Sequence, residues 1–146
     1  MVYSNLKDET EYVMNIMTPY ANMHHVRIQL SFHNTLMLKY DKNQIQQCLI
    51  NLYKNGIEAM KETGGTLAID VSEKKKTINF KISDNGIGMS SEEVAQLGRP
   101  YYSTKKEGTG LGMLMVYSTI SKVNGKIRVE SEKGKGTTFN LTIPAV

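Results

Sequence analysis

The chain has 146 residues, a length typical of one compact domain. Hydrophobic residues make up 40% and charged residues 22% of it, an ordinary globular composition that excludes disordered, collagen-like and coiled-coil proteins. Lysine and arginine outnumber aspartate and glutamate by 18 to 14, a net charge of +4, which favours an anionic partner without choosing between nucleic acid, a membrane surface and a phosphorylated small molecule.

The single cysteine, Cys48, excludes an internal disulfide and fits a reducing compartment. The sequence has no set of cysteines and histidines at the spacing of zinc ligands. It also has no apolar run of about 20 residues that could span a membrane, and its amino terminus lacks the basic segment followed by an apolar segment that is typical of a signal peptide. We therefore expect no structural zinc, no membrane contact and a cytoplasmic location. The densest basic run, residues 74–76, is interpreted as a solvated hairpin turn, since no nucleic-acid-binding motif accompanies it.

The first third of the chain alternates between helical and strand-like patterns. Apolar residues at mostly helical spacing predict a helix over residues 6–23. Period-two alternation predicts short strands over residues 26–32 and 36–40, joined by a turn. Apolar residues that recur every three or four positions predict a long helix over residues 42–61, which ends before Gly64-Gly65.

Two β-rich segments follow, over residues 66–72 and 77–83, and the lysine run joins them as a hairpin. A short helix is predicted over residues 92–97. Residues 98–110 have no period but carry three glycines and one proline. Structureless loops of that length inside a compact domain are usually lids or binding loops, so this loop is a candidate functional segment.

The last elements are a helix over residues 111–123 and two strands over residues 126–131 and 137–143. Together the elements predict an α/β two-layer sandwich of α+β type, with a mixed β-sheet covered on one face by about three helices. No repeat or linker divides the sequence, and the prediction is a single domain over residues 1–146.

Glycine clusters mark two candidate ligand-binding segments. The first is Asp84-Asn85-Gly86-Ile87-Gly88, where a carboxylate at a strand end can accept a hydrogen bond from an exocyclic amine while the glycines leave room for a flat ring. A purely structural turn is an equal alternative. The second is Gly108-Thr109-Gly110-Leu111-Gly112, which leads into a helix whose N-terminal N–H groups suit a polyphosphate. A third cluster, residues 134–137, is taken alone as a hairpin turn.

Two amides lie one helical turn apart in the long helix. Asn51 and Asn55 share a polar face with Glu58, opposite the apolar face. Amide oxygens are suitable ligands for a divalent cation that also contacts phosphates, since hard cations prefer oxygen. A solvated helix face is the alternative for this pair in isolation.

The order and spacing of these segments resemble the catalytic domain of sensor histidine kinases. The resemblance comprises their N box at residues 47–60, G1 box at 84–88, F box at 100–105, G2 box at 108–112 and closing glycine turn and strand at 134–139. It covers nearly the whole chain and is nearest to the nitrogen-regulatory and sporulation kinase subgroup. It implies the Bergerat ATP-binding fold of the GHKL superfamily, shared with type II topoisomerases and MutL, with a mobile ATP lid at about 89–107.

Carried over residue by residue, the resemblance implies that Asp84 receives the adenine amino group and that Gly86 and Gly88 shape the base pocket. It implies that Asn55 holds Mg²⁺, and that Asn51 and Asn55 are the catalytic residues. The implied ATP-binding set is Asn51, Lys54, Asn55, Asp84, Gly86, Gly88, Lys105, Gly108, Thr109, Gly110, Leu111 and Gly112. Gly56 departs from the family pattern, which usually has alanine there.

The identity of residue 51, an asparagine, helps to distinguish phosphate transfer from ATP hydrolysis. Hydrolytic relatives and anti-sigma-factor serine kinases carry a glutamate general base at this place, and an amide cannot take a proton at neutral pH. The resemblance therefore implies a protein-histidine kinase domain that presents the γ-phosphate of Mg-ATP to an external imidazole. The alternatives are a degenerate nucleotide-binding docking module and a Bergerat-fold ATPase or serine kinase.

The acceptor histidine is expected outside this chain. His24, His25 and His33 all lack the sequence context of the family's phosphoacceptor helix. The resemblance implies partners in a phosphoacceptor and dimerisation domain and, through it, a response regulator. The chain alone is expected to be a monomer that does not autophosphorylate, cut from a homodimeric parent kinase whose membrane anchoring stays open, and no nucleic-acid partner is expected.

Overall fold

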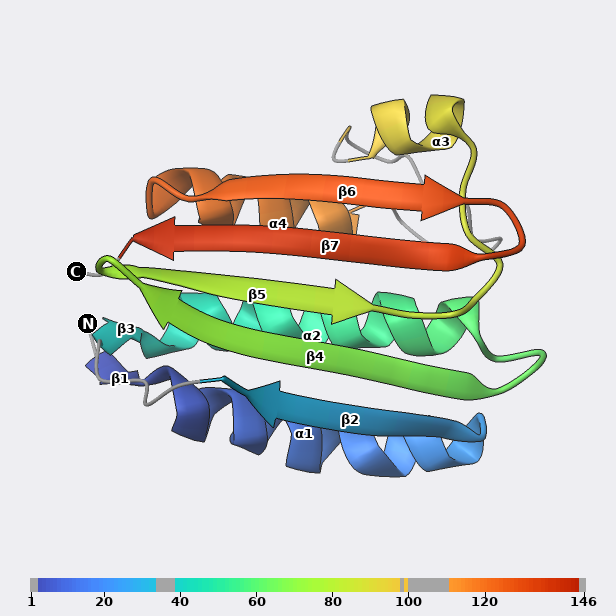
Figure 1. The fold of residues 1–146 in the computed structure, drawn as a ribbon, viewed down its shortest axis with the longest axis horizontal. Coiled ribbons are helices and arrows are strands. Elements are labelled where there is room, and N and C mark those ends of the chain that lie inside the picture. Colours follow the sequence, from blue (N-terminus) through green and yellow to red (C-terminus); the bar gives the residue numbers. More distant parts are fainter. Residues whose placement is uncertain (1–2, 34–38, 98, 100–110, 145–146) are drawn as a thin grey trace.

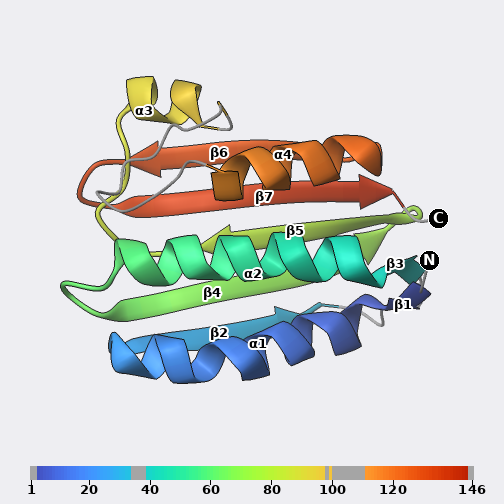
Figure 2. The same ribbon diagram turned by 180° about the vertical axis from the view of Figure 1, so that it is seen from behind.

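The computed structural model describes residues 3–33, 39–97, 99 and 111–144. These residues form two layers, a five-stranded sheet and three helices packed on one of its faces (Figures 1 and 2). In spatial order the strands are β2 (Val26–Phe32), β4 (Gly65–Lys74), β5 (Thr77–Ser83), β7 (Gly136–Pro144) and β6 (Lys126–Glu132). The covering helices are α1 (Leu6–Met23), α2 (Lys42–Ala59) and α4 (Leu111–Lys122). The predicted two-layer architecture is confirmed.

The sheet is mixed, as predicted. The β2 strand pairs in parallel with β4, while the β4–β5, β5–β7 and β6–β7 pairs are antiparallel. A fourth helix, α3 (Ser91–Gln96), lies beyond the edge strand β6 and has no buried residue (Figure 1). The parallel pair requires a long crossover, and α2 lies within it.

The central helix α2 follows the sequence pattern closely. The apolar positions of the predicted helix are all buried and join one core, and they are Ile45, Cys48, Leu49, Leu52, Ile57 and, directly after the end of α2, Met60. The opposite face, with Asn51, Asn55 and Glu58, is half-buried. The helix ends at Ala59, two residues earlier than predicted, and the chain turns at Gly64, whose φ is +70°.

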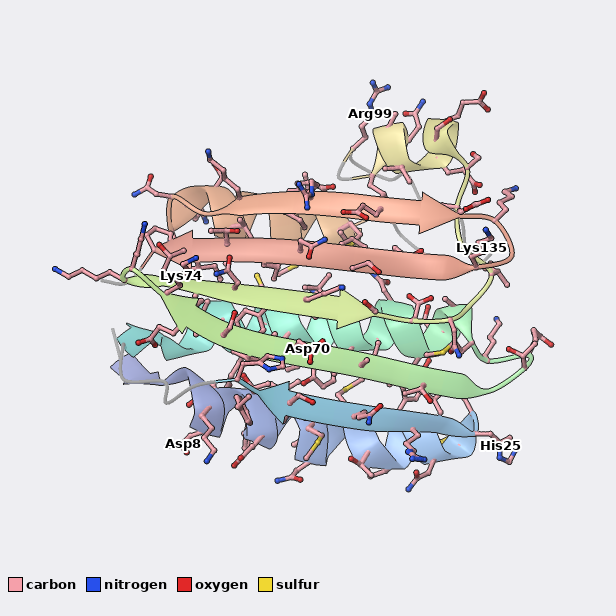
Figure 3. All side chains as sticks on the ribbon, in the orientation of Figure 1. Asp8, His25, Asp70, Lys74, Arg99 and Lys135 are labelled. Carbon is pink, nitrogen blue, oxygen red and sulfur yellow. The ribbon has the colours of Figure 1, made fainter. Side chains whose placement is uncertain are left out.

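The face of the sheet turned away from the helices is polar (Figure 3). Hydrogen bonds link neighbouring strands there, between the Ser83 and Thr138 hydroxyls at 3.0 Å and from Thr142 Oγ1 to Asn79 Oδ1 at 3.2 Å. The alternate residues of β4, β5 and β7 are apolar and buried under the helices. The helix-covered face is therefore where residues from strand ends and helices can meet.

The lysine run forms the predicted hairpin turn. Lys74 pairs with Thr77, which leaves a two-residue loop of Lys75 and Lys76. Both loop residues have positive φ, +52° and +61°, as a type I′ turn requires. The turn matches the right-handed twist of the two strands, so the run has a structural role.

The strands predicted over residues 26–32 and 36–40 do not pair with each other in the described part of the chain. The second is β3 (Lys39–Asp41), which pairs antiparallel with β1 (Tyr3–Asn5) in a separate small sheet. Residues 36–38 lie outside the described residues. Within the described ranges, we find no helix with the length and apolar character needed to span a membrane.

Candidate functional site

Asp84 lies directly after β5 and faces the helical layer, because it is two residues beyond the buried Ile82. Its Oδ1 accepts hydrogen bonds from the backbone N–H of Gly86 at 2.9 Å and of Thr137 at 3.3 Å. Burial raises the pKa of the Asp84 carboxyl above its ordinary value, and the two N–H donors oppose that rise. The result is a half-buried carboxylate fixed by backbone contacts.

The glycines that follow Asp84 pack tightly against neighbouring backbone. A Cβ on Gly86 would come within 2.5 Å of the Ala59 carbonyl oxygen, at the end of α2. Gly88 has φ +69°, and a Cβ there would collide with the Glu132 carbonyl. The Ile87 N–H also donates to the Ala59 oxygen at 3.2 Å. The turn over residues 84–88 is thus fixed between α2 and the β6–β7 hairpin, and packing alone requires its two glycines.

The polar face of α2 is covered by the first turn of α4. Asn51 Nδ2 lies 3.5 Å from the Gly112 carbonyl oxygen, and Asn55 Nδ2 donates to Met113 Sδ at 3.0 Å. A Cβ added to Gly112 would lie 3.9 Å from Asn51 Oδ1, an ordinary van der Waals distance, so the helix α4 approaches the amide closely without excluding a side chain at this position. The two amides are therefore half-buried against α4 rather than fully solvated. They lie beside a helix N-terminus, where backbone N–H groups lack intrahelical partners.

Lys54 lies on the exposed surface of α2 rather than between the helices. Its Nζ is 3.9 Å from Glu58 Oε1, one helical turn along. The Glu58 oxygen also accepts a hydrogen bond from Tyr20 Oη on α1, at 3.5 Å. The Lys54 side chain is 59% exposed and the distance is long, so the pair contributes little to stability and the ammonium can change partner at small cost.

Several predicted site residues cannot be placed. Lys105, Gly108, Thr109 and Gly110 lie outside the described residues, as does most of the lid predicted over residues 89–107. Leu111 is the first residue of α4. The described beginning of the lid is the short helix α3, which Ser90 caps: its hydroxyl accepts from the Glu93 N–H, and the Glu93 carboxylate accepts from the Ser90 N–H.

The site also includes residues that sequence reasoning missed. The cluster over residues 134–137 forms the predicted hairpin turn, but Gly136 lies against the Asp84 backbone, where a Cβ would collide with the Asp84 carbonyl. Thr137, which is 6% exposed, donates to Asp84 Oδ1. The 53-residue separation of Thr137 from Asp84 hides this contact from local patterns, and only the sequence Gly-Lys-Gly-Thr signals that the turn is unusual.

The side chains of this region suit a magnesium ion that takes one ligand from the protein and the others from water and phosphate. Among the described residues, no three His, Cys, Asp or Glu side chains gather to hold a metal. Asn55 directs its amide nitrogen to Met113, and an amide offers its oxygen from the other side of the same group. A single hard oxygen fits Mg²⁺, which keeps several waters and binds phosphate oxygens.

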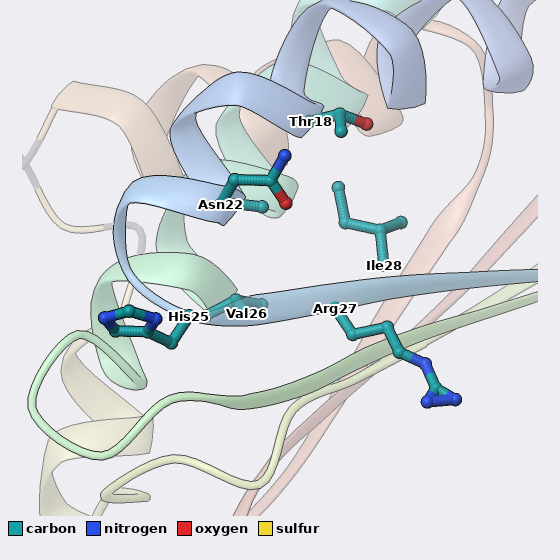
Figure 4. A pocket seen from close by; sticks show the side chains of 7 residues that line it. Thr18, Asn22, His25, Val26, Arg27 and Ile28 are labelled. Atoms are coloured by element: carbon teal, nitrogen blue, oxygen red, sulfur yellow. The ribbon is translucent and has the colours of Figure 1, made fainter.

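A shallow hollow of about 500 Å³ lies elsewhere, between the end of α1 and the start of β2 (Figure 4). It contains none of the residues predicted to bind nucleotide. Thr18, Asn22 and Ile28 lie on one side of β2, whereas Arg27 points to the other side (Figure 4). Charged groups do not converge in the hollow, so we assign it no role.

Relatives in sequence are bacterial kinases. Residues 40–146 match the family described as "Histidine kinase-, DNA gyrase B-, and HSP90-like ATPase". The chain is 36% identical over 132 residues to Sporulation kinase E of Bacillus subtilis (strain 168), covering 90% of this chain and 18% of that protein. It is 37% identical over 131 residues to Sporulation kinase B of the same organism, covering 90% and 31%. The chain spans only about a fifth to a third of the length of these relatives.

Solved structures agree on the fold. The nucleotide-free catalytic domain of histidine kinase ThkA has a TM-score of 0.86 at 24% identity, covering 99% of this chain and 95% of that one. Full-length ShkA in complex with AMPPNP has a TM-score of 0.88 at 20% identity, covering 99% and 31%. The family match, the kinase relatives and the shared fold lead to one conclusion: the chain belongs to the family of histidine kinase-, DNA gyrase B- and HSP90-like ATPases.

Proposed function

We propose that this chain is the catalytic and ATP-binding domain of a two-component histidine kinase, which binds Mg-ATP and presents the γ-phosphate to a histidine on a separate domain. The observation that carries the proposal is the convergence of the Asn51 and Asn55 amides on the first turn of α4. A helix N-terminus beside two amides is suited to phosphate oxygens and their cation. Kinase relatives above 30% identity support the reaction class.

In this proposal, Asp84 accepts a hydrogen bond from the adenine amino group, while Gly86 and Gly88 hold the turn against which the base lies. Asn51, Lys54 and the glycine segment around Gly112 contact the phosphates. Asn55 is the protein ligand of Mg²⁺, which supplies charge neutralisation at the phosphates when bound. The remaining proposed phosphate contacts are Lys105, Gly108, Thr109, Gly110 and Leu111.

Asn51 and Asn55 are the proposed catalytic residues, and their contribution is positioning. An amide side chain stays neutral at every physiological pH, so Asn51 can orient a phosphate oxygen but cannot activate water as a general base. A neutral histidine needs no such base, because its imidazole nitrogen carries a lone pair. The site therefore favours transfer to histidine over hydrolysis.

The proposed partners follow from the short span of the chain relative to its relatives. We infer a single catalytic domain over residues 1–146, with a lid at about 89–107, that acts on a phosphoacceptor and dimerisation domain and, through it, on a response regulator. The chain alone is expected to be a monomer and the parent kinase a homodimer. We propose a cytoplasmic location, since ATP is supplied there.

The test is a calorimetric titration of the chain with Mg-ATP while phosphate release is followed in the same sample. Saturable binding with negligible release supports the proposal, because the amide at position 51 leaves no base for hydrolysis. Steady turnover would overturn it in favour of an ATPase. Absence of binding would overturn it in favour of a degenerate docking module. The Asp84→Asn variant, expected to bind ATP at least tenfold more weakly, controls for binding outside this site.

A further inference from the structure

Three polar side chains form a row across the covered face of the sheet, at the end where the turn over residues 84–88 lies. Asp84 follows β5, Thr137 is the second residue of β7, and Ser131 is the last residue but one of β6. Ser131 and Thr137 are paired in the β6–β7 register. The Thr137 N–H donates to Asp84 Oδ1 at 3.3 Å, so the row is continuous through hydrogen bonds.

The Ser131 hydroxyl uses its full hydrogen-bonding capacity. Its oxygen accepts from the Met89 N–H at 2.7 Å and lies 2.8 Å from Thr137 Oγ1. It donates to the Gly136 carbonyl oxygen at 3.1 Å. A serine hydroxyl has one proton and two lone pairs. Because Gly136 takes the proton, the Thr137 hydroxyl must be the donor in its contact with Ser131. This contact orients the side chain of the residue whose backbone N–H donates to Asp84 Oδ1.

The Met89 end of this network begins the segment that leads into α3. Gly134 N–H donates to the Ile87 carbonyl oxygen at 2.8 Å, and Lys133 Nζ lies 3.4 Å from Glu93 Oε1. The Lys133 pair is exposed and contributes little. The bond between Met89 and Ser131 is shorter and half-buried, so it is the stronger tie between the root of the predicted lid and the edge strand.

We propose that Ser131 is a positioning residue that couples the nucleotide site at Asp84 to the root of the lid at Met89. The inference rests on the proposed function. Loss of the hydroxyl would remove the partner of the Met89 N–H and of the Gly136 oxygen, and it would release the side chain of Thr137, whose backbone N–H contacts Asp84. Binding of nucleotide at Asp84 would then no longer change the hydrogen bonding of the Met89 N–H.

The experiment measures Mg-ATP affinity by calorimetry and the hydrogen exchange of the Met89 amide, for the parent chain, Ser131→Ala, Asp84→Asn and the double variant. We expect Ser131→Ala to weaken affinity about five- to tenfold in the parent background and less than about twofold in the Asp84→Asn background. We also expect ATP to slow Met89 exchange in the parent but not in Ser131→Ala. Ser131→Thr, which keeps the hydroxyl in a strand, should restore both readouts.

A matched control is Ser83→Ala, which removes a hydroxyl from the same sheet but on its opposite face, where it contacts Thr138. It should leave ATP affinity and Met89 exchange unchanged. Equal losses from Ser131→Ala in both backgrounds would overturn the coupling and assign Ser131 a purely structural role, as would unchanged affinity. If the folded parent binds no ATP, the proposed function fails as well. If the parent binds ATP but the losses of affinity in Ser131→Ala and Asp84→Asn add up in the double variant, only the inference about Ser131 is overturned.

Discussion

At the scale of single residues, Asp84 combines a stability cost with the proposed role in nucleotide binding. Its carboxyl is half-buried in the helix-covered face, and desolvation raises its pKa despite two backbone N–H donors. A group whose pKa is raised by folding holds its proton more tightly in the folded state than in the unfolded state. The free energy of unfolding therefore falls as pH rises from the ordinary pKa of 3.8 through the raised value, and it stays lower above that window.

We predict that Asp84→Asn is more stable than the parent at pH 7, although it binds ATP more weakly. An asparagine keeps an oxygen acceptor for the N–H groups of Gly86 and Thr137 but carries no charge to desolvate. The stability gain should shrink as pH falls through the raised pKa and vanish below the ordinary value. Thermal unfolding from acid to neutral pH checks it, and a pH-independent difference would contradict the argument.

Asp70→Asn is the matched control. Asp70 lies on the polar face of the sheet, is 44% exposed in its side chain and pairs with His33 at 3.1 Å. Its replacement removes the same charge without relieving burial. We expect no gain in stability from it at pH 7 and no change in ATP affinity.

The sequence could point to Asp84, Asn51 and Asn55 as candidate site residues because each belongs to a local motif. Sequence reasoning missed Thr137 and Ser131, whose contacts depend on strand register rather than on neighbouring residues. The glycines of residues 134–137 are enough to predict a hairpin turn, but they do not indicate that the end of β5, with Asp84, lies beside this turn. The packing role of Gly86 and Gly88 was equally hidden, because it arises from the approach of Ala59 and Glu132.

At the scale of elements, α2 carries a conflict at Gly56. Alanine is usual there in the family that the sequence resembles, and it would favour the helix by about 1 kcal/mol. A Cβ at this position, however, would lie 2.5 Å from Leu67 Cδ1, and Leu67 is fully buried on β4. Shifting a buried leucine costs about 1–3 kcal/mol.

We predict that Gly56→Ala lowers the free energy of unfolding by about 1 kcal/mol, because the overpacking exceeds the gain in helix propensity. Urea unfolding measures the change. The double variant Gly56→Ala with Leu67→Val should recover most of the loss, since valine lacks the terminal methyl carbon that the new Cβ meets. A gain in stability from Gly56→Ala alone would show that Leu67 repacks without cost.

Elements with a strong period were predicted nearly to the residue, whereas β1 was not predicted and β3 was predicted only in part. The helix α2 and the strands β5 and β7 have long apolar patterns that local physics decides. The three-residue strands β1 and β3 are too short to show a period, and they exist because each pairs with the other across the chain. Tertiary contact, rather than propensity, defines them.

At the scale of the whole molecule, the proposed site joins three elements that are distant in sequence. The amides belong to α2, the carboxylate follows β5, and Gly112 lies in α4. The two-layer class could be predicted from element order, but the parallel pairing of β2 with β4 could not, because two strands separated by a helix have several possible neighbours. The proposed nucleotide would therefore stabilise the assembly of the fold as well as the local contacts.

We predict that Mg-ATP at about 100 times its Kd raises the free energy of unfolding by about 2.7 kcal/mol, because a ligand that binds only the folded state shifts the equilibrium by mass action. The single thermal transition should move upward as one step, since α2, β5 and α4 all hold the ligand in the proposed site.

Removal of the metal with EDTA at constant ATP should reduce the shift, because phosphate charge next to Asn55 is then left uncompensated. Asp84→Asn should show a smaller shift than the parent at the same ATP concentration. An unchanged shift in EDTA would overturn the assignment of Mg²⁺ to Asn55, and an unchanged shift in Asp84→Asn would overturn the adenine assignment.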